Sequence, residues 1–394
     1  MLPDWAIGAG VVLVCCVLIG ILRGSGLLIK NLRVLHNIYQ FPDNEILGQP
    51  PFVSVIIPAK DEEDFIADSV HSVLDSHYTN MELIVVDDRS IDRTGNICSA
   101  ISQSDSRMKV LTIRDLPEGW TGKTHALYRG VEKASGEILL FIDADTVITN
   151  DVIGRAVGYL LRNNLGMLGL LPSFKDPGWI EKVVYPHLAL GISFLNPLSE
   201  VNNPDSTAGI ASGSFIMITR HAYHAVGTWE RFRQEITEDI ALSRVIKKCK
   251  LGLQVLMGYD AVRTRSFNGL SAMKRFWQRT FYGGFEKSII KICLLCVMFV
   301  VLGIVLPAIT VTSAITMYAG NSTIYLQILV AITLTTLFAT AFVYTIFLKC
   351  TQHANWLYSI TTPIGLILGA WVSASTLLTI LNNKGIRWRG SVYK

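Results

Sequence analysis

Two aspartates separated by one residue, Asp143 and Asp145, follow an apolar run in the segment EILLFIDADT. Such a run is typical of a strand buried on both faces. Because residues i and i+2 of a strand face the same side, the two carboxylates are expected to converge just past the strand's end. Two such charges repel each other unless a cation lies between them. The spacing therefore suggests a site for Mg²⁺ or Mn²⁺, which prefer oxygen ligands, although solvated strand-end aspartates have the same pattern.

Acidic residues also follow two other apolar runs. Asp87 and Asp88 end the run in VVDDRSIDRT, and Glu62 lies just after Pro58 and Ala59 in FVSVIIPAKDEED. In an open parallel sheet, ligands bind beyond the carboxyl ends of the strands. These residues are therefore expected at one edge of a sheet, together with the aspartate pair.

A third acidic pair, Glu238 and Asp239, precedes a helical pattern in ITEDIALS. A helix N-terminus favours negative charge, so in isolation this pair is explained as helix-end charges.

Short runs rich in Val and Ile alternate with helical patterns between residues 50 and 262. The expected strands are FVSVIIPA, MELIVVDD, MKVLTIRD and EILLFIDAD, and helices are expected over residues 63–76 and 124–134. This alternation predicts an α/β domain with a Rossmann-like, mostly parallel sheet and helices on both faces. Farther along, Ser212, Gly213 and Ser214 lie in a strand-like segment, where a glycine permits close approach of a ligand or loop.

The composition indicates a protein with both a globular part and membrane-spanning helices. Of 394 residues, 50% are hydrophobic and 17% charged, and the mean hydropathy is +0.40. A net charge of +4 does not indicate nucleic-acid binding. The seven cysteines lie mostly in apolar runs and form no disulfide framework.

Apolar segments long enough to span a bilayer are expected at both ends of the chain. Residues 1–33 contain an apolar stretch, 5–22, followed by basic residues, which predicts a retained anchor with the following domain in the cytoplasm. Residues 288–382 contain three more stretches, 288–318, 323–348 and 354–381. The basic tail, 383–394, favours a cytoplasmic end, whereas three spans would place it outside, so one segment could be split at Pro307 or Pro363.

Residues 263–287 are basic and amphipathic. Met273, Phe276, Trp277 and Phe281 fall on one helical face, and seven Lys or Arg lie between residues 263 and 291. A segment of this kind is expected to lie on an anionic membrane surface.

Taken in order, PAKDEE, VVDDRSIDRT, GWTGKTHAL, FIDADT and TED resemble the motifs of family 2 glycosyltransferases with the GT-A fold. The resemblance covers roughly residues 52–284. It is greatest to the membrane-anchored, lipid-modifying branch, which includes hopene-associated, carotenoid and ceramide glucosyltransferases. It implies transfer of a hexose from a UDP-sugar, with Mg²⁺ or Mn²⁺, to a membrane-embedded lipid hydroxyl.

The resemblance also implies roles for individual residues on the donor side. Asp87 or Asp88, with Ala59 and Glu62, would hold the uridine base and ribose. Asp143 and Asp145 would bind the metal and, through it, the diphosphate. The full set implied for the nucleotide sugar is Pro58, Ala59, Glu62, Asp87, Asp88, Lys123 and Asp143.

On the acceptor side, the resemblance implies that Asp239 is the catalytic base, with Glu238 beside it. Many family members carry Gln-x-x-Arg-Trp after the base, and this chain does not, which argues against processive polymer synthesis. Trp277, Gln278 and Arg279 lie in the corresponding region and could line the acceptor or diphosphate side.

The sequence is also consistent with two other functions. One is transfer to a polyprenyl phosphate, which needs no strong base because the acceptor is already an anion. The other is a non-catalytic membrane scaffold that retains the fold but binds neither UDP nor metal.

Overall fold

A computed structural model of the protein describes residues 36–41, 49–195, 197–320, 322–351, 355–382, 386–388 and 391–393, with positions 8, 11–12, 14–15, 17–20, 23 and 26. The predicted N-terminal anchor lies largely outside the described residues. The chain divides into two compact units. The sheet unit comprises Val34–Asp176 and Leu198–Ser266, and the helical unit comprises Met1–Arg33, Pro177–Pro197 and Phe267–Lys394.

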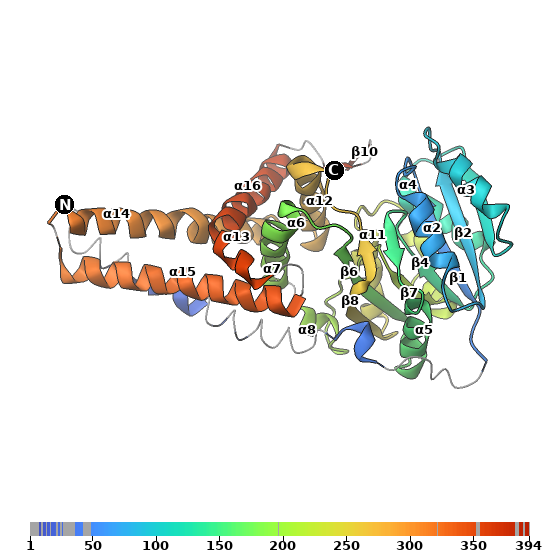
Figure 1. The fold of residues 1–394 in the computed structure, drawn as a ribbon, viewed down its shortest axis with the longest axis horizontal. Coiled ribbons are helices and arrows are strands. Elements are labelled where there is room, and N and C mark those ends of the chain that lie inside the picture. The colour runs from blue at the N-terminus through green and yellow to red at the C-terminus, as the bar shows by residue number, and fades with distance from the viewer. Residues whose placement is uncertain are drawn as a thin grey trace. The chain divides into compact units, whose positions relative to one another are not determined.

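The sheet unit contains one mixed sheet of eight strands with surrounding helices (Figure 1). Its strands are β1 (Val53–Ala59), β2 (Met81–Asp88), β3 (Met108–Ile113), β4 (Ile138–Phe141), β5 (Thr146–Ile148), β6 (Met167–Phe174), β7 (Ile216–Thr219) and β8 (Leu253–Thr264). Its helices are η1 (Ile38–Gln40), α2 (Ile66–Leu74), α3 (Thr94–Ser102), α4 (Gly122–Lys133), α5 (Val152–Arg162), α8 (Leu198–Val201), α9 (Arg220–Ala225), α10 (Thr228–Arg231) and α11 (Glu238–Lys248). The four strands and two helices predicted from the sequence are therefore confirmed.

The strand order is β3-β2-β1-β4-β7-β6-β8-β5. The first four strands are mutually parallel, β7 is antiparallel to both β4 and β6, and β8 is parallel to β6. Strand β5 is antiparallel to β8. The sheet is thus mostly parallel, as predicted, and β1, β2, β4 and β8 all end at the same edge.

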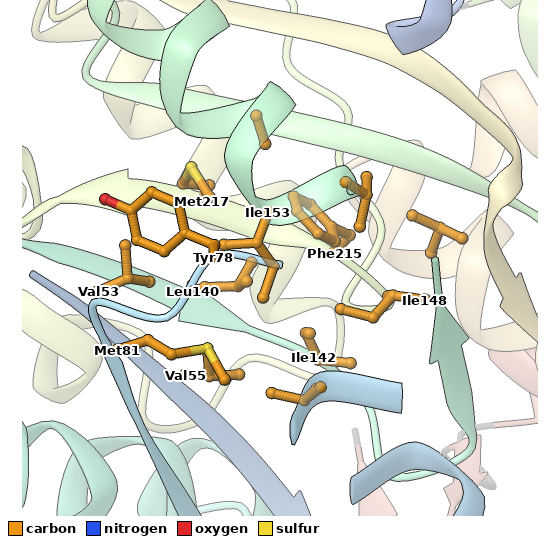
Figure 2. Packing of buried hydrophobic residues seen from close by; sticks show 14 of the residues in the cluster. Val53, Val55, Tyr78, Met81, Leu140, Ile142, Ile148, Ile153, Phe215 and Met217 are labelled. Carbon is orange, nitrogen blue, oxygen red and sulfur yellow. The ribbon is translucent and has the colours of Figure 1, made fainter. Parts of the chain in front are cut away.

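Alternating side chains of each strand enter two separate cores, one on each face of the sheet. In β4, Ile138 and Leu140 join the core under α2, α3 and α5, whereas Leu139 and Phe141 join the core under α4, α10 and α11. Figure 2 shows the first of these cores, with Leu140 and Ile142 packed among residues from other strands and helices. A sheet buried on both faces is what the continuous apolar runs predicted.

The helical unit is built from long apolar helices and shorter segments. They are α6 (Trp179–Val183), α7 (Tyr185–Leu195), α12 (Gly269–Gly284), α13 (Ile289–Val300), the π-helical turn η2 (Val301–Val305), α14 (Leu306–Tyr318), α15 (Ile324–Thr351), η3 (Trp356–Thr361) and α16 (Thr362–Leu381), with a hairpin of β9 (Ile386–Trp388) and β10 (Ser391–Tyr393).

Among the described residues of this unit, three stretches are long and apolar enough to cross a membrane. They are Ile289–Tyr318, Ile324–Lys349 and Trp356–Leu381, in agreement with the three predicted C-terminal segments. The first continues through the π-helical turn that precedes Pro307. Such a turn accommodates a proline, which cannot donate a backbone hydrogen bond. Pro363 lies in the first turn of α16, where a proline is tolerated.

The apolar face of α12 is covered by protein within the helical unit. Met273, Trp277 and Phe281 are each at most 2% exposed and belong to the core that also contains residues of α13 and α16. The basic side chains lie elsewhere on the helix, where Arg275 is exposed and Lys274 lies over the Trp371 ring at 4.9 Å. The membrane-surface role of this segment stays a prediction, with the basic face as its basis.

Candidate active site

The acidic residues singled out in the sequence gather at the carboxyl edge of the sheet. Asp87 and Asp88 are the last two residues of β2, and Ala59, the last residue of β1, is paired in register with Asp87. The Asp143–Asp145 turn follows β4 and leads directly into β5. Parallel packing therefore brings together residues that are far apart in the chain.

The aspartate pair lies in a turn, because β4 ends at Phe141. The strand-like alternation nevertheless persists: Ile142 and Ala144 are 1% and 4% exposed and enter the core, whereas Asp143 and Asp145 are half-buried. Both carboxylates are thus directed away from that core, but each contacts a different basic side chain of the protein.

Asp143 is bound by Lys123, which lies in the first turn of α4. The lysine Nζ is 2.6 Å from Asp143 Oδ1 and 2.7 Å from Glu238 Oε1. Helix α4 is held in place at its start by Thr121, whose hydroxyl caps the helix and whose N–H donates to the Arg233 carbonyl at 2.7 Å. A single ammonium group therefore joins the predicted leaving-group side to the TED motif.

Electrostatics favour the charged lysine at this position. Burial lowers the pKa of the Lys123 ammonium. The neighbouring carboxylates, of which Asp143 has the largest effect, raise it by more, so that this pKa lies above its ordinary value. The lysine is therefore protonated and serves as a fixed cation.

Gly213 is the point at which these side chains approach the backbone. A Cβ atom at this position would lie 2.5 Å from Lys123 Nζ and 2.9 Å from Asp143 Oδ2. The Gly213 N–H also donates to Asp239 Oδ2 at 3.0 Å. The close approach predicted at this glycine is thus present, and it is made by the side chains of Lys123, from α4, and Asp143, from the turn after β4.

Glu238 and Asp239 begin helix α11 and have different surroundings. Glu238 is 4% exposed and faces Lys123, whereas Asp239 is half-buried. The orientation of Asp239 is set by Gly213 and by the Ile240 N–H, which donates to Asp239 Oδ1 at 2.8 Å. A small pocket is lined in part by Glu238, Pro58, Lys123 and Gly213.

The predicted nucleoside side is built from loops that are tied to one another. Asp88 accepts two hydrogen bonds from the Arg89 guanidinium, at 2.7 and 2.9 Å. Asp87 accepts a weaker one from the Ser90 N–H at 3.3 Å. The Glu62 N–H donates to the Thr94 hydroxyl at 2.8 Å. Asp88 is thus engaged by a bidentate arginine, whereas Asp87 has a weaker contact, and the nucleoside-binding role of both stays a prediction.

Sequence reasoning missed Arg265, which follows β8 directly. Its Nε lies 2.9 Å from Asp145 Oδ2, and its Nη1 lies 3.2 Å from Glu62 Oε2. The Thr264 hydroxyl also donates to Asp145 Oδ1, at 3.4 Å. The signal that could have found Arg265 is the strand-like run LQVLMGYDAVRT, since a basic residue at the end of a parallel strand reaches the same edge as the acids.

The residues predicted for the acceptor or diphosphate side belong to the helical unit. Trp277 is 2% exposed in the core of that unit, and the Gln278 amide donates to the Ser375 hydroxyl of α16 at 3.3 Å. The Arg279 guanidinium lies over the Phe276 ring at 5.6 Å. Packing within the helical unit thus accounts for the positions of these three side chains. Their role toward a substrate stays a prediction.

The donor set at this edge suits a hard divalent cation only in part. Asp143 and Asp145 supply carboxylate oxygens, and the space beside Gly213 would be filled by any larger residue. In the described part of the chain, however, no three His, Cys, Asp or Glu side chains are grouped as metal ligands. The residues therefore fit a cation that takes its remaining ligands from a bound diphosphate, which is how Mg²⁺ is commonly held.

Comparison with known sequences places the part of this edge formed by β1, β2, α4 and the turn after β4 in a known domain. The sequence profile of Glycosyl transferase family 2 matches residues 54–227. The chain is 27% identical over 248 residues to a beta-monoglucosyldiacylglycerol synthase of Nostoc sp., covering 62% of this chain and 51% of that protein. It is 25% identical over 230 residues to a 4,4'-diaponeurosporenoate glycosyltransferase of Staphylococcus aureus, covering 58% and 60%. The matches thus span between about half and three fifths of these relatives.

A solved structure shares the fold over most of the chain. It is the mannosyltransferase PcManGT from Pyrobaculum calidifontis, in complex with GDP-Man and Mn²⁺, with a TM-score of 0.50 and 17% identity over 92% of this chain and 99% of that one. At this identity the likeness concerns the fold. The sequence match, the fold and the clustered motif residues agree, and the chain carries a glycosyltransferase family 2 domain.

Proposed function

We propose that this protein transfers a hexose, with inversion, from a UDP-sugar to the hydroxyl group of a lipid in the membrane. The observation that carries the proposal is the convergence at Gly213. This glycine contacts Asp143 and Lys123 on the leaving-group side and donates a hydrogen bond to Asp239 on the other side. Groups that could stabilise the leaving group and a base for the attacking hydroxyl thus lie close together.

In the proposed step, the acceptor oxygen attacks the anomeric carbon of the sugar. Its proton passes to the Asp239 carboxylate as the new carbon–oxygen bond forms. The bond between the anomeric carbon and the diphosphate breaks, and the diphosphate leaves with the electron pair. Lys123 offsets the negative charge that develops on it.

A divalent cation completes the proposed site. Asp143 and Asp145 would hold Mg²⁺ or Mn²⁺, which supplies Lewis-acid stabilisation of the departing diphosphate. Lys123 binds and orients the phosphates, and Gly213 leaves the space that they need. The Mn²⁺ in the mannosyltransferase with the same fold supports this assignment.

The lipid acceptor is supported by the relatives and by the helical unit. The relatives' names describe a glucosyldiacylglycerol synthase and a diaponeurosporenoate glycosyltransferase, both of which act on lipids. In the described part of the chain, three helices are long and apolar enough to cross a membrane. We infer a multi-pass membrane protein whose sheet unit faces the cytoplasm, where UDP-sugars are made available.

The test is incubation of membranes containing the protein with a panel of labelled UDP-sugars and Mn²⁺, followed by lipid extraction. Label is expected in the lipid fraction. Label that remains in water-soluble polymer, or no transfer and no UDP binding, would overturn the proposal.

Aspartate variants distinguish the hydroxyl acceptor from a polyprenyl phosphate. Asp239→Asn and Asp145→Asn are each expected to lower the rate by roughly 10²–10⁴-fold, because a base and a metal ligand are both needed for a hydroxyl acceptor. The exposed Asp260 serves as a control when changed to asparagine. Retention of near-normal rate by the Asp239 variant alone would indicate a phosphate acceptor instead.

A further inference from the structure

Arg265 connects the predicted metal side of the site to the predicted nucleoside side. Its guanidinium reaches Asp145 with Nε, at 2.9 Å, and Glu62 with Nη1, at 3.2 Å. It also lies over the Phe65 ring at 4.9 Å, which holds the plane of the guanidinium. A planar fork with several donors can contact two carboxylates at once, which a lysine cannot do in the same way.

The two carboxylates proposed to bind metal are each engaged by a basic side chain of the protein. Lys123 lies on Asp143 and Arg265 lies on Asp145. A divalent cation that binds there competes with both. The described residues also provide no third acidic, histidine or cysteine ligand, so protein ligands alone give the cation few favourable contacts.

The Arg265 side chain is more exposed than its two carboxylate partners, which suits an exchangeable contact. Glu62 and Asp145 side chains are 2% and 16% exposed, whereas the Arg265 side chain is 41% exposed. Water can solvate the exposed guanidinium when it leaves, whereas a nearly buried carboxylate must keep a partner. Arg265 can therefore be exchanged for a ligand that takes its place on the carboxylate, while the carboxylates themselves stay in place.

We propose that Arg265 is a positioning residue that couples donor binding to metal binding. This inference rests on the proposed use of a UDP-sugar and a divalent cation. A nucleoside that engages Glu62 removes one of the two partners of Arg265 and weakens its hold on Asp145, which then becomes available to the cation. By thermodynamic linkage, a cation on Asp145 releases Arg265 and makes Glu62 available to the nucleoside to the same extent.

The test measures binding, independently of turnover. Mn²⁺ is titrated into the full-length protein in detergent, with and without UDP, and free Mn²⁺ is followed by electron paramagnetic resonance. In the unmodified protein, UDP is expected to raise the affinity for Mn²⁺ by a factor within the usual coupling range, roughly 5–150-fold. With Arg265→Gln, the affinity for Mn²⁺ alone should rise, and the factor contributed by UDP should fall by about threefold or more.

Two further variants complete the design. Arg265→Lys keeps the positive charge and secures a folded protein, and it should also lower the coupling, because one ammonium group cannot replace the fork. Arg263→Gln is the matched control: Arg263 is exposed near the end of β8, two residues before Arg265, and its Nε donates to the Asp260 carbonyl at 3.2 Å. This control should leave both affinities unchanged.

The outcomes separate this inference from the proposed function. Unchanged Mn²⁺ affinity and unchanged coupling in both Arg265 variants would overturn the role of Arg265, while UDP binding would still support the function. If the unmodified protein binds neither UDP nor Mn²⁺, the proposed function itself fails. If the Arg263 variant behaves as the Arg265 variants do, the effect comes from net charge and the specific contact is excluded.

Discussion

Glu238 and Asp239 are neighbours in the chain, yet they differ in burial and in the groups that they contact. Glu238 is buried and its carboxylate lies 2.7 Å from Lys123 Nζ, so it holds the lysine beside Asp143. Asp239 is half-buried and is oriented by the Gly213 N–H. We therefore propose that Glu238 positions Lys123 and that Asp239 accepts the proton.

The first prediction concerns Glu238→Gln. Loss of one charged partner should let Lys123 shift toward Asp143 and should weaken donor binding, since a hydrogen bond to a charged group contributes about 1.5–3 kcal/mol. We expect the KM for the UDP-sugar to rise about 10–100-fold, with a smaller fall in kcat. The measurement is steady-state kinetics with labelled donor. A kcat that falls to the level of Asp239→Asn at unchanged KM would assign proton transfer to Glu238 instead.

The second prediction concerns Gly213→Ala. The added methyl would lie 2.5 Å from Lys123 Nζ, so the lysine must move and UDP affinity should fall by about tenfold or more. Gly169→Ala is the matched control, because a Cβ there meets nothing closer than 3.5 Å. Calorimetry with UDP and Mn²⁺ measures both variants. Equal UDP affinity in the two would show that the space beside Gly213 is not used by the donor.

At the scale of elements, a buried carboxylate joins the strands that carry the site. Glu82 of β2 is 4% exposed. It accepts hydrogen bonds from the Ser54 hydroxyl of β1 and from Ser135, just before β4, each at 2.7 Å, and pairs with Lys109 of β3 at 2.8 Å. It thereby holds four adjacent strands in register at the edge opposite the site.

The third prediction follows from the pKa of Glu82. Burial raises this pKa, but hydrogen bonds from Lys109, Ser135 and Ser54 outweigh it and lower the pKa from 4.5 to about 2. Because the folded-state pKa is depressed, the stabilisation is fully present above about pH 4.5 and is lost as the pH falls toward about 2. Unfolding temperatures measured across this range should fall more steeply for the unmodified protein than for Glu82→Gln.

The control for this prediction is Glu118→Gln, at an exposed position. It should follow the unmodified protein at every pH. At neutral pH, only Glu82→Gln should unfold at a lower temperature. Parallel pH profiles for all three proteins would show that the Glu82 cluster does not contribute to acid sensitivity.

At the scale of the whole molecule, a globular sheet unit and an apolar helical unit share one chain. Many large side chains of the long helices are exposed, among them Val311, Ile315, Phe338, Phe342 and Ile364. Surfaces of this kind are unfavourable in water and suit a lipid environment. The helical unit is thus the part of the chain that suits a membrane, and the proposed chemistry lies in the sheet unit.

The fourth prediction tests the side of the membrane on which the sheet unit lies. Cys249 at the end of α11 is exposed, whereas Cys98 is buried. A membrane-impermeant maleimide should label Cys249 in inside-out vesicles and leave it unlabelled in intact cells. Cys249→Ser identifies the labelled site. Labelling in intact cells that disappears with this substitution would place the sheet unit outside.

The sequence alone determined which apolar runs form strands and which acidic residues follow them, the mostly parallel sheet and the three C-terminal apolar helices, although β4 ends at Phe141, before the aspartate pair. Each depends on local information: apolar runs, side-chain periodicity and motif spacing are recorded in neighbouring residues. Pro58, Asp87, Asp143, Lys123 and Asp239 could therefore be named in advance as site candidates.

Only the tertiary structure decided which charges meet. Arg265 is 203 residues from Glu62 in the chain, and no local pattern pairs them. The same holds for Lys123 with Glu238, and for Gly213 with Asp239. Such contacts depend on the strand order, in which β8 and β4 end at one edge although β5, β6 and β7 separate them in sequence. The packing of distant segments thus brings the local motifs together, and it decides which basic side chain or N–H group contacts each carboxylate.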